Sequence, residues 1–216
     1  MPSTRFLLQE AFERMFKHFG PRHWWPGETV FEVMVGAILT QNTNWKNVER
    51  AITNLKNENV LSPLKLYDLH PEVLSELIKP VGYFRVKTDR LRNFLKFFIE
   101  KYDAQVENMR ERSVDTLREE LLSVKGIGPE TADSIILYAV EKPIFVIDAY
   151  TKRIMSRHNL CFEEDGYNEL QEIFMSNLQN DAQLFNEYHA LIVETGKQFC
   201  RKEPLCDKCP LSGCNK

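Results

Sequence analysis

The residues of this chain whose types and spacing are best suited to chemistry are four cysteines that stand close together in one segment. Four thiolates in one short loop can surround a cubane 4Fe-4S cluster or hold one tetrahedral Zn²⁺. Zinc ribbons usually pair two Cys-x2-Cys knuckles across a longer insertion, and this segment has one such knuckle. The pattern predicts a metal-binding loop at 200–214 with the ligands Cys200, Cys206, Cys209 and Cys214.

A second candidate site is the turn Gly126-Ile127-Gly128, which is followed by Pro129. Glycine adopts backbone angles that a side chain forbids, and proline suits the first position of a helix, whose N–H has no partner within the helix. The free N–H groups of such a turn, together with the positive end of a helix dipole, can bind one or two phosphates of a nucleic-acid strand without reading its sequence. We therefore expect a helix, a turn and a second helix here.

Apolar residues recur at helical spacing along most of the chain, and no convincing alternating strand pattern is present, so the predicted fold class is all-α. The segment 30–39 is apolar almost all round, which predicts a buried central helix. The segment 86–101 predicts a long helix. The pattern after Asp148 predicts three more helices, at 149–158, 165–178 and 181–197.

The composition is that of a globular protein with a real core, since the chain has 216 residues and a hydrophobic share of 43%. No run of about 18 uncharged apolar residues is present, so we expect a cytoplasmic protein with no membrane partner. The formal net charge of −3 argues against a nucleic-acid binder. Basic residues nevertheless gather at 85–96, which predicts either a local DNA-binding face or a solvated helix face.

Five segments, taken together and in order, resemble the helix-hairpin-helix DNA glycosylases of the endonuclease III type. The resemblance covers nearly the whole chain, and the order of the segments makes it specific. The segments are LTQNT at 39–43, VGYFRVK at 81–87, GIGPETA at 126–132, VIDAYTKRI at 146–154 and HALIVETGKQFC at 189–200.

The resemblance implies two helical lobes with DNA bound across the cleft. The first would be a central domain, 29–142, that contains the hairpin, and the second would be formed by 1–28 and 143–216. The partner would be double-stranded DNA with a damaged base, and the protein would be a monomer. In this family the cysteine loop holds a 4Fe-4S cluster. Because each outer gap of the loop is one residue shorter here than in endonuclease III, zinc is kept as the less favoured alternative.

The resemblance also implies contacts with DNA. Gln41 would fill the gap that the extruded nucleotide leaves in the duplex, and the turn at Val81 and Gly82 would wedge the opposite strand. The hairpin would hold phosphates through Lys125, Gly126 and Gly128. On residue type alone, Gln41 is an ordinary amide that ends a helix.

Asp148 is the position that the resemblance makes catalytic. A carboxylate beside a sugar can stabilise the oxocarbenium-like centre that develops as the glycosidic bond breaks, and it can orient the attacking water. On residue type alone, Asp148 would be a helix N-cap. At Glu130 the chain departs from endonuclease III, which has a lysine there that forms a Schiff base and cuts the strand. A carboxylate cannot do this, so Glu130 predicts a glycosylase without AP-lyase activity, although Lys125 and Lys152 are amines nearby in the sequence.

The three tryptophans of the chain lie in two aromatic segments. A flipped base needs flat partners, and a positively charged base, such as an N3- or N7-methylated purine, gains from an electron-rich indole face. Tryptophans are also common anchors of protein cores. The WWP segment followed by LTQNT resembles the 3-methyladenine glycosylases of this family. The predicted base pocket is Trp24, Trp25, Pro26, Trp45 and Glu130.

These residues predict an enzyme, a monofunctional DNA N-glycosylase of base excision repair that removes an alkylated purine such as 3-methyladenine. One alternative is an endonuclease III-like glycosylase for oxidised or mismatched pyrimidines, which would share the fold and Asp148. The other is a non-catalytic iron–sulfur DNA-binding module, which would use the hairpin only to hold phosphates.

Overall fold

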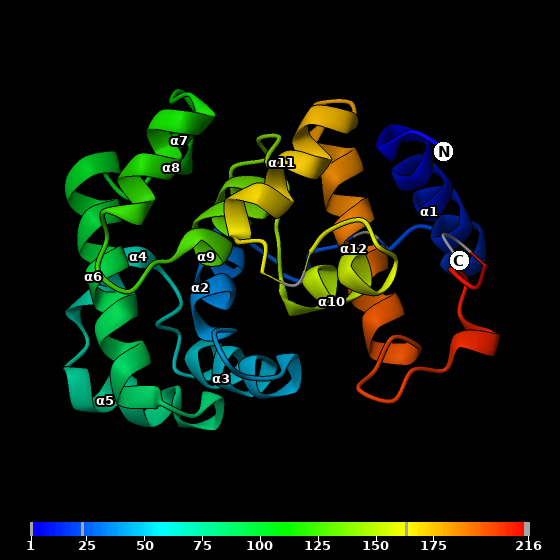
Figure 1. Cartoon of the computed structure of the whole chain (residues 1–216). Coiled ribbons are helices and arrows are strands. Elements are labelled where there is room, and N and C mark those ends of the chain that lie inside the picture. Colours follow the sequence, from blue (N-terminus) through cyan, green and yellow to red (C-terminus); the bar gives the residue numbers. More distant parts are fainter. Residues whose placement is uncertain (1, 23, 163, 214–216) are drawn as a thin grey trace. The chain divides into compact units, whose positions relative to one another are not determined.

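The computed structural model describes residues 2–22, 24–162 and 164–213, which form twelve α-helices and contain no strand (Figure 1). The prediction of an all-α fold is therefore confirmed for the described residues. The chain divides into two compact units: a central unit, Trp25–Lys142, and a terminal unit, Met1–Trp24 with Pro143–Lys216. The helices are α1 (Thr4–Phe19), α2 (Val30–Leu39), α3 (Trp45–Asn57), α4 (Pro63–Asp68), α5 (Pro71–Leu77), α6 (Phe84–Tyr102), α7 (Val106–Arg110), α8 (Val114–Leu122), α9 (Pro129–Ser134), α10 (Ala149–Arg157), α11 (Tyr167–Asn177) and α12 (Ala182–Gln198).

Helix α2 forms the core of the central unit. Thr29 caps it, because the Thr29 hydroxyl accepts a hydrogen bond from the N–H of Glu32 at 3.1 Å. Every residue from Glu32 to Leu39 is buried. The helix packs against α3, α6, α9 and a π-helical turn at Ile135–Ala139. The predicted buried central helix at 30–39 is confirmed, and its burial on all sides explains why its sequence lacks a polar face.

Helix α6 is the long helix predicted at 86–101, and it begins two residues earlier and ends one residue later than predicted. Its buried side chains include Leu91, Phe94, Leu95 and Phe98, and it packs against α2, α4 and α5. This helix therefore lies beside both the core helix and the short helices that precede it. The basic residues of the segment 85–96 lie at different depths on this helix, since Arg85 and Lys96 are exposed whereas Lys87 is buried.

The terminal unit joins the two ends of the chain. Helix α12 packs against α10 and α1, and Figure 1 shows the blue α1 beside the orange α12. The Tyr188 hydroxyl donates a hydrogen bond to the carbonyl oxygen of Leu8 at 2.8 Å. Gly196 lies so close to the Tyr150 ring that a Cβ there would approach ring carbon Cδ1 to 2.3 Å. Glycine at this position thus allows α12 to pack closely against α10.

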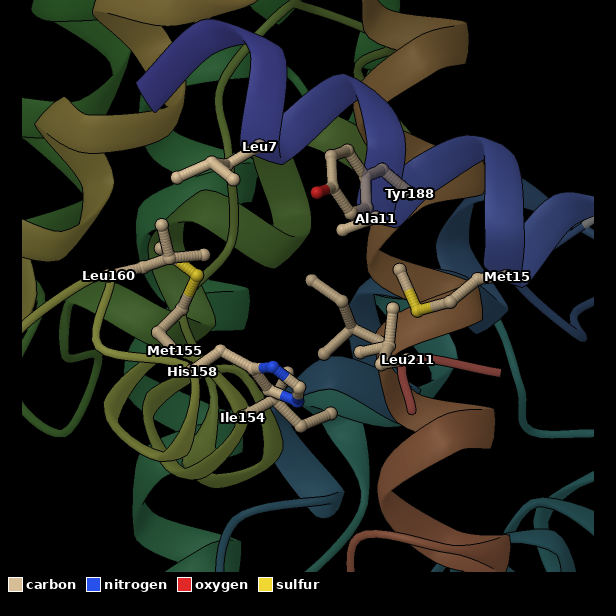
Figure 2. A pocket seen from close by; sticks show the side chains of 10 residues that line it. Leu7, Ala11, Met15, Ile154, Met155, His158, Leu160, Tyr188 and Leu211 are labelled. Atoms are coloured by element: carbon tan, nitrogen blue, oxygen red, sulfur yellow. The ribbon is translucent and has the colours of Figure 1, made fainter. Parts of the chain in front are cut away.

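A small cavity of about 20 Å³ lies between α1, α10 and α12 in the terminal unit (Figure 2). Its lining is mostly apolar and includes Leu7, Met15, Ile154 and Leu211. A cavity of this size has room for about one water molecule, but an apolar cavity stays dry. We therefore interpret it as a packing gap between the two ends of the chain.

The three helices predicted after Asp148 are α10, α11 and α12, and their ends differ from the predicted ones by at most two residues. The division into domains at 29–142 and at 1–28 with 143–216 stays a prediction, because compact packing does not by itself show that a unit folds independently. In the described part of the chain, no helix is both long enough and apolar enough to cross a membrane.

Candidate functional site

The hairpin of the central unit joins α8 to α9. Lys125 and Gly126 are exposed at its turn, whereas Ile127 is buried and anchors it. Gly126 has a φ angle of 98°, in the left-handed region that favours glycine. Gly128 is the N-cap of α9, and Pro129 is its first residue. The sequence therefore predicted the local geometry of this turn from its glycines and proline.

Gln41 lies in the turn after α2, and its side chain contacts the hairpin. Its Nε2 donates hydrogen bonds to the carbonyl oxygen of Gly126 at 3.1 Å and to Thr131 Oγ1 at 2.9 Å. Its Oε1 accepts a hydrogen bond from the Arg90 guanidinium. The structure thus brings two of the predicted DNA-contacting segments together, and it adds Arg90 and Thr131 as residues that hold them.

The turn before α6 exposes a residue that the sequence analysis did not single out. Val81 is 1% exposed, so its side chain belongs to the core of the central unit. Gly82 and Tyr83 both have positive φ angles, 64° and 46°, and Tyr83 is 75% exposed. The side chain that this turn presents to solvent is therefore that of Tyr83. The clue in the sequence was an aromatic residue next to the glycine of a turn.

The basic residues of α6 do not form one solvated face. Lys87 is 1% exposed, and its Nζ donates hydrogen bonds to the carbonyl oxygens of Leu39 at 3.0 Å and Val81 at 2.9 Å. Burial, with a smaller contribution from neighbouring Arg90, lowers the pKa of Lys87 to about 8. Arg92 donates to two backbone carbonyls near the end of α4. These cations therefore satisfy the polar ends of other segments.

Two of the three tryptophans meet in the central unit. The Trp25 ring lies edge-on to Trp45, with 5.2 Å between centroids, and 4.8 Å from the centroid of Tyr138. Gly36 lies beside both indoles, since a Cβ there would be in ordinary van der Waals contact with each of them at 3.5 Å. Both tryptophans are half-buried. The result is an aromatic cluster of Trp25, Trp45 and Tyr138, and its tyrosine was not expected from the sequence.

The other predicted pocket residues have different surroundings. Trp24 belongs to the terminal unit, where Lys197 Nζ lies 5.3 Å from its ring centroid. That distance is typical of a cation–π contact. Pro26 is exposed at the start of the central unit, and Glu130 is exposed in the first turn of α9. Trp24 and Trp25 are thus neighbours in the sequence that belong to different units.

Asp148 is the N-cap of α10 in the terminal unit. Its Oδ1 accepts hydrogen bonds from the Thr151 N–H at 2.7 Å and from the Thr151 hydroxyl at 2.9 Å. The buried segment from Ile144 to Ile147 leads into it, and Gln171 Nε2 donates to the Phe145 carbonyl oxygen at 2.6 Å. The Asp148 side chain is 13% exposed. One carboxylate oxygen thus caps the helix, and the other is not needed for the cap.

That second oxygen, Asp148 Oδ2, lies 3.7 Å from Nε2 of His189 on α12. Burial lowers the pKa of His189, an effect that Asp148 opposes and that Lys197 reinforces. The imidazole is therefore neutral at neutral pH and adds no positive charge beside the carboxylate. Nothing in the sequence predicted a role for His189 beyond packing, although it opens one of the five segments that carry the family resemblance.

Three of the four predicted metal ligands line one cavity of about 150 Å³ in the terminal unit, namely Cys200, Cys206 and Cys209. Cys200 Sγ accepts a hydrogen bond from the Arg157 guanidinium at 3.3 Å. Cys214 lies outside the described residues. Within the described ranges, no three histidine, cysteine or acidic side chains gather as metal ligands. Cysteine side chains around one cavity are nevertheless the ligands that iron–sulfur clusters and zinc use.

Comparison with known proteins places these features in context. Residues 35–180 match the family described as "HhH-GPD superfamily base excision DNA repair protein". A protein of Methanocaldococcus jannaschii, named "Putative DNA repair glycosylase MJ1434", is 50% identical over 214 residues, which cover 98% of this chain and 97% of that protein. Endonuclease III of Thermotoga maritima is 30% identical over 205 residues, which cover 94% of this chain and 89% of that protein.

Two solved structures resemble this chain in fold. The H. pylori 3-methyladenine DNA glycosylase (MagIII) bound to 1,N6-ethenoadenine superposes with a TM-score of 0.77 and is 30% identical, over 91% of this chain and 98% of that one. A trapped covalent intermediate of endonuclease III with DNA superposes with a TM-score of 0.82 over 98% of this chain and 94% of that one. Its identity of 22% shows a shared fold.

Proposed function

This chain belongs to the HhH-GPD superfamily of base excision DNA repair proteins, and we propose that within it the protein is a monofunctional DNA N-glycosylase for alkylated purines such as 3-methyladenine. That it is a base excision DNA repair glycosylase follows from the family and from the relative that is 50% identical. The observation that carries the proposed chemistry is the placement of Asp148, whose Oδ1 caps α10 while Oδ2 lies beside a neutral histidine.

In the proposed reaction, the bond between sugar carbon C1′ and the base nitrogen breaks, and the base leaves with both bonding electrons. The Asp148 carboxylate stabilises the positive charge that develops on the sugar. Water then adds to C1′ and gives up a proton, for which Asp148 Oδ2 is the proposed acceptor. The products are a free base and an abasic site in an unbroken strand.

The proposal that the strand stays unbroken rests on the amines near the motif. Glu130 stands where endonuclease III has its nucleophilic lysine, and a carboxylate cannot form a Schiff base. Lys152 Nζ donates a hydrogen bond to the carbonyl oxygen of Asp165 at 2.8 Å, which ties it within the terminal unit. Lys125 is exposed on the hairpin, where a role in phosphate binding suits its charge.

The proposed substrate class rests on the aromatic cluster of Trp25, Trp45 and Tyr138. Indole faces attract a cationic base, and N3- and N7-methylated purines carry a positive charge that also makes them good leaving groups. A 30% identical structure of a 3-methyladenine glycosylase with a modified adenine supports the same class. For the duplex itself, we propose contacts from Gln41, Tyr83 and the hairpin residues.

We also propose that the four cysteines hold a 4Fe-4S cluster, which is supported by the cavity that three of them line. Such a cluster, when bound, would tie the loop 200–214 to the end of α12. The test is the metal content of protein purified without oxygen, measured before and after Cys209→Ser. We expect about four iron atoms per chain in the wild type and a loss of most of them in the variant. A colourless wild-type protein that contains zinc and no iron would overturn the cluster.

The function is tested with a panel of duplexes that each carry one lesion, comprising 3-methyladenine, 7-methylguanine, 1,N6-ethenoadenine, thymine glycol and a G·T mismatch. Chromatography measures the free base, and gel electrophoresis before and after alkali separates base release from strand cleavage. We expect release of methylated purines and strand breaks only after alkali. Release from thymine glycol or G·T alone would support the endonuclease III-like alternative, which the 30% identity to endonuclease III also favours. A covalent adduct after borohydride would refute the absence of lyase activity.

A further inference from the structure

Two cations on one face of α6 hold the segments that surround the hairpin. Lys87 and Arg90 are three residues apart, so their side chains leave the helix on the same side. Lys87 donates to the carbonyl oxygens of Leu39 and Val81. Leu39 ends α2, and the last carbonyls of a helix lack partners within that helix. Through one ammonium group, Lys87 therefore holds the backbone just before Gln41 and the backbone just before Gly82.

Arg90 fixes a side chain rather than a backbone. Its guanidinium donates to Gln41 Oε1, and the Gln41 amide in turn donates to Gly126 and Thr131. Three hydrogen bonds thus engage both ends of the Gln41 amide, and one of them comes from a charged donor. Hydrogen bonds with a charged partner are roughly twice as strong as neutral ones.

The close approach of Arg90 also accounts for a glycine. A Cβ at Gly126 would lie 2.4 Å from Cγ of Arg90, so the aliphatic part of Arg90 covers the turn directly. The hairpin glycine therefore has two requirements: its positive φ angle and the contact with Arg90. Arg90 is in this way bound to the turn through its stem and to Gln41 through its head.

We propose that Arg90 is a positioning residue that keeps Gln41 docked on the hairpin in the free protein, and that this docking opens when Gln41 enters damaged DNA. The inference rests on the proposed function, in which Gln41 fills the gap left by an extruded nucleotide. The two N–H donors of the Gln41 amide are occupied by Gly126 and Thr131, so in the docked state they cannot be offered to a base. Docking therefore competes with insertion, and undamaged duplex, which is costly to open, leaves Gln41 on the hairpin.

The first test needs no DNA. In ¹⁵N-labelled full-length protein, the side-chain NH₂ resonances of Gln41, assigned by their loss in Gln41→Ala, should be dispersed and slow to exchange with solvent. Arg90→Met keeps the stem that covers Gly126 and removes the charged donor, whereas Thr131→Val removes one acceptor without changing size. We expect either variant to move the Gln41 resonances toward free-amide positions. Unchanged resonances in both variants would overturn the docking.

The second test measures insertion by the fluorescence of 2-aminopurine placed opposite an abasic-site analogue in a duplex. If docking competes with insertion, Arg90→Met should raise the insertion equilibrium about tenfold, because it removes one charge-assisted hydrogen bond from the docked state. Thr131→Val should shift it in the same direction, and Gln41→Ala should abolish both effects. Weaker insertion in Arg90→Met together with no change in Thr131→Val would overturn the proposal and show Arg90 to be a DNA-contacting cation.

These readouts separate the inference from the proposed function. Base release is not measured in either test, so a wild-type protein that docks and inserts Gln41 but releases no base would refute the glycosylase proposal alone. A protein that releases methylated purines while its Gln41 amide is free in the absence of DNA would refute the docking alone.

Arg90→Lys adds a check to the resonance test. It keeps the charge, and we expect it to restore part of the dispersion that Arg90→Met loses.

Discussion

Replacing Asp148 with asparagine should slow base release strongly and leave the fold almost unchanged. The cap survives, because an asparagine oxygen can accept the same hydrogen bonds from the N–H and hydroxyl of Thr151 that Asp148 Oδ1 accepts at 2.7 and 2.9 Å. What is lost is the negative charge. At the N-terminus of α10 that charge stabilises the helix by about 0.3–1 kcal/mol, so the free energy of unfolding should fall by no more than this.

The effect on the reaction is larger. A carboxylate roughly 4 Å from a developing unit positive charge gains about 4 kcal/mol at an effective dielectric constant near 20. Because about 1.4 kcal/mol in the barrier corresponds to a tenfold change in rate, Asp148→Asn should slow base release by about a thousandfold. Single-turnover release of a methylated purine, with enzyme in excess over duplex, measures this rate without interference from product dissociation.

The terminal unit offers a matched control at Asp181. This residue caps α12 as Asp148 caps α10, and its Oδ1 accepts a hydrogen bond from the Leu184 N–H at 2.6 Å. Asp181→Asn should therefore cost as little stability as Asp148→Asn and leave base release unchanged. The assignment of Asp148 fails if Asp148→Asn retains more than about a tenth of the wild-type rate, or if Asp181→Asn slows release by a comparable factor.

Two further predictions concern stability. The pKa of His189 is lowered by burial, with Asp148 opposing and Lys197 reinforcing the shift. As the pH falls below about 6.5, the imidazole of His189 therefore takes up a proton in the unfolded chain before it does so in the folded protein. Below that pH, the free energy of unfolding measured in urea should fall by up to about 1.4 kcal/mol per pH unit. His189→Gln should flatten this dependence. Parallel curves for the wild type and the variant would contradict a buried neutral histidine. Gly126→Ala should lower the free energy of unfolding by about 1–3 kcal/mol, because alanine is strained at positive φ and its Cβ would meet Arg90. Gly128→Ala is the control, because a Cβ at Gly128 would meet open space and its φ angle is −100°. Equal losses of unfolding free energy in the two variants would refute this account.

Much of the local structure could be predicted because its causes lie within a few residues. The apolar run at 30–39 gave the buried helix α2, and Gly126 and Pro129 gave the turn and the start of α9. Asp148 caps a helix through Thr151, three residues ahead, so its role as an N-cap could be predicted from residue type. The catalytic reading of Asp148 came from family resemblance and stays a proposal.

The partners of the charged residues could not be predicted in this way. Lys87, Arg90 and Arg92 suggested an exposed basic face, yet Lys87 is buried and all three donate to other segments. Lys87 can be buried because carbonyl groups at the ends of two other segments accept its hydrogen bonds. Where those ends lie depends on how distant segments pack. The pairing of Asp148 with His189 likewise required α12 to pack against α10.

The sequence by itself thus determined the main helices and the hairpin turn, because periodicity, glycine and proline act over one or two turns of chain, and the order of its motifs indicated the family. Only the tertiary structure decided which side chain lies beside the second oxygen of Asp148, which aromatic rings meet around Trp25, and where Gln41 rests. Those outcomes depend on contacts between residues far apart in the chain, and such contacts form only when the packed helices bring the residues within a few ångströms of one another.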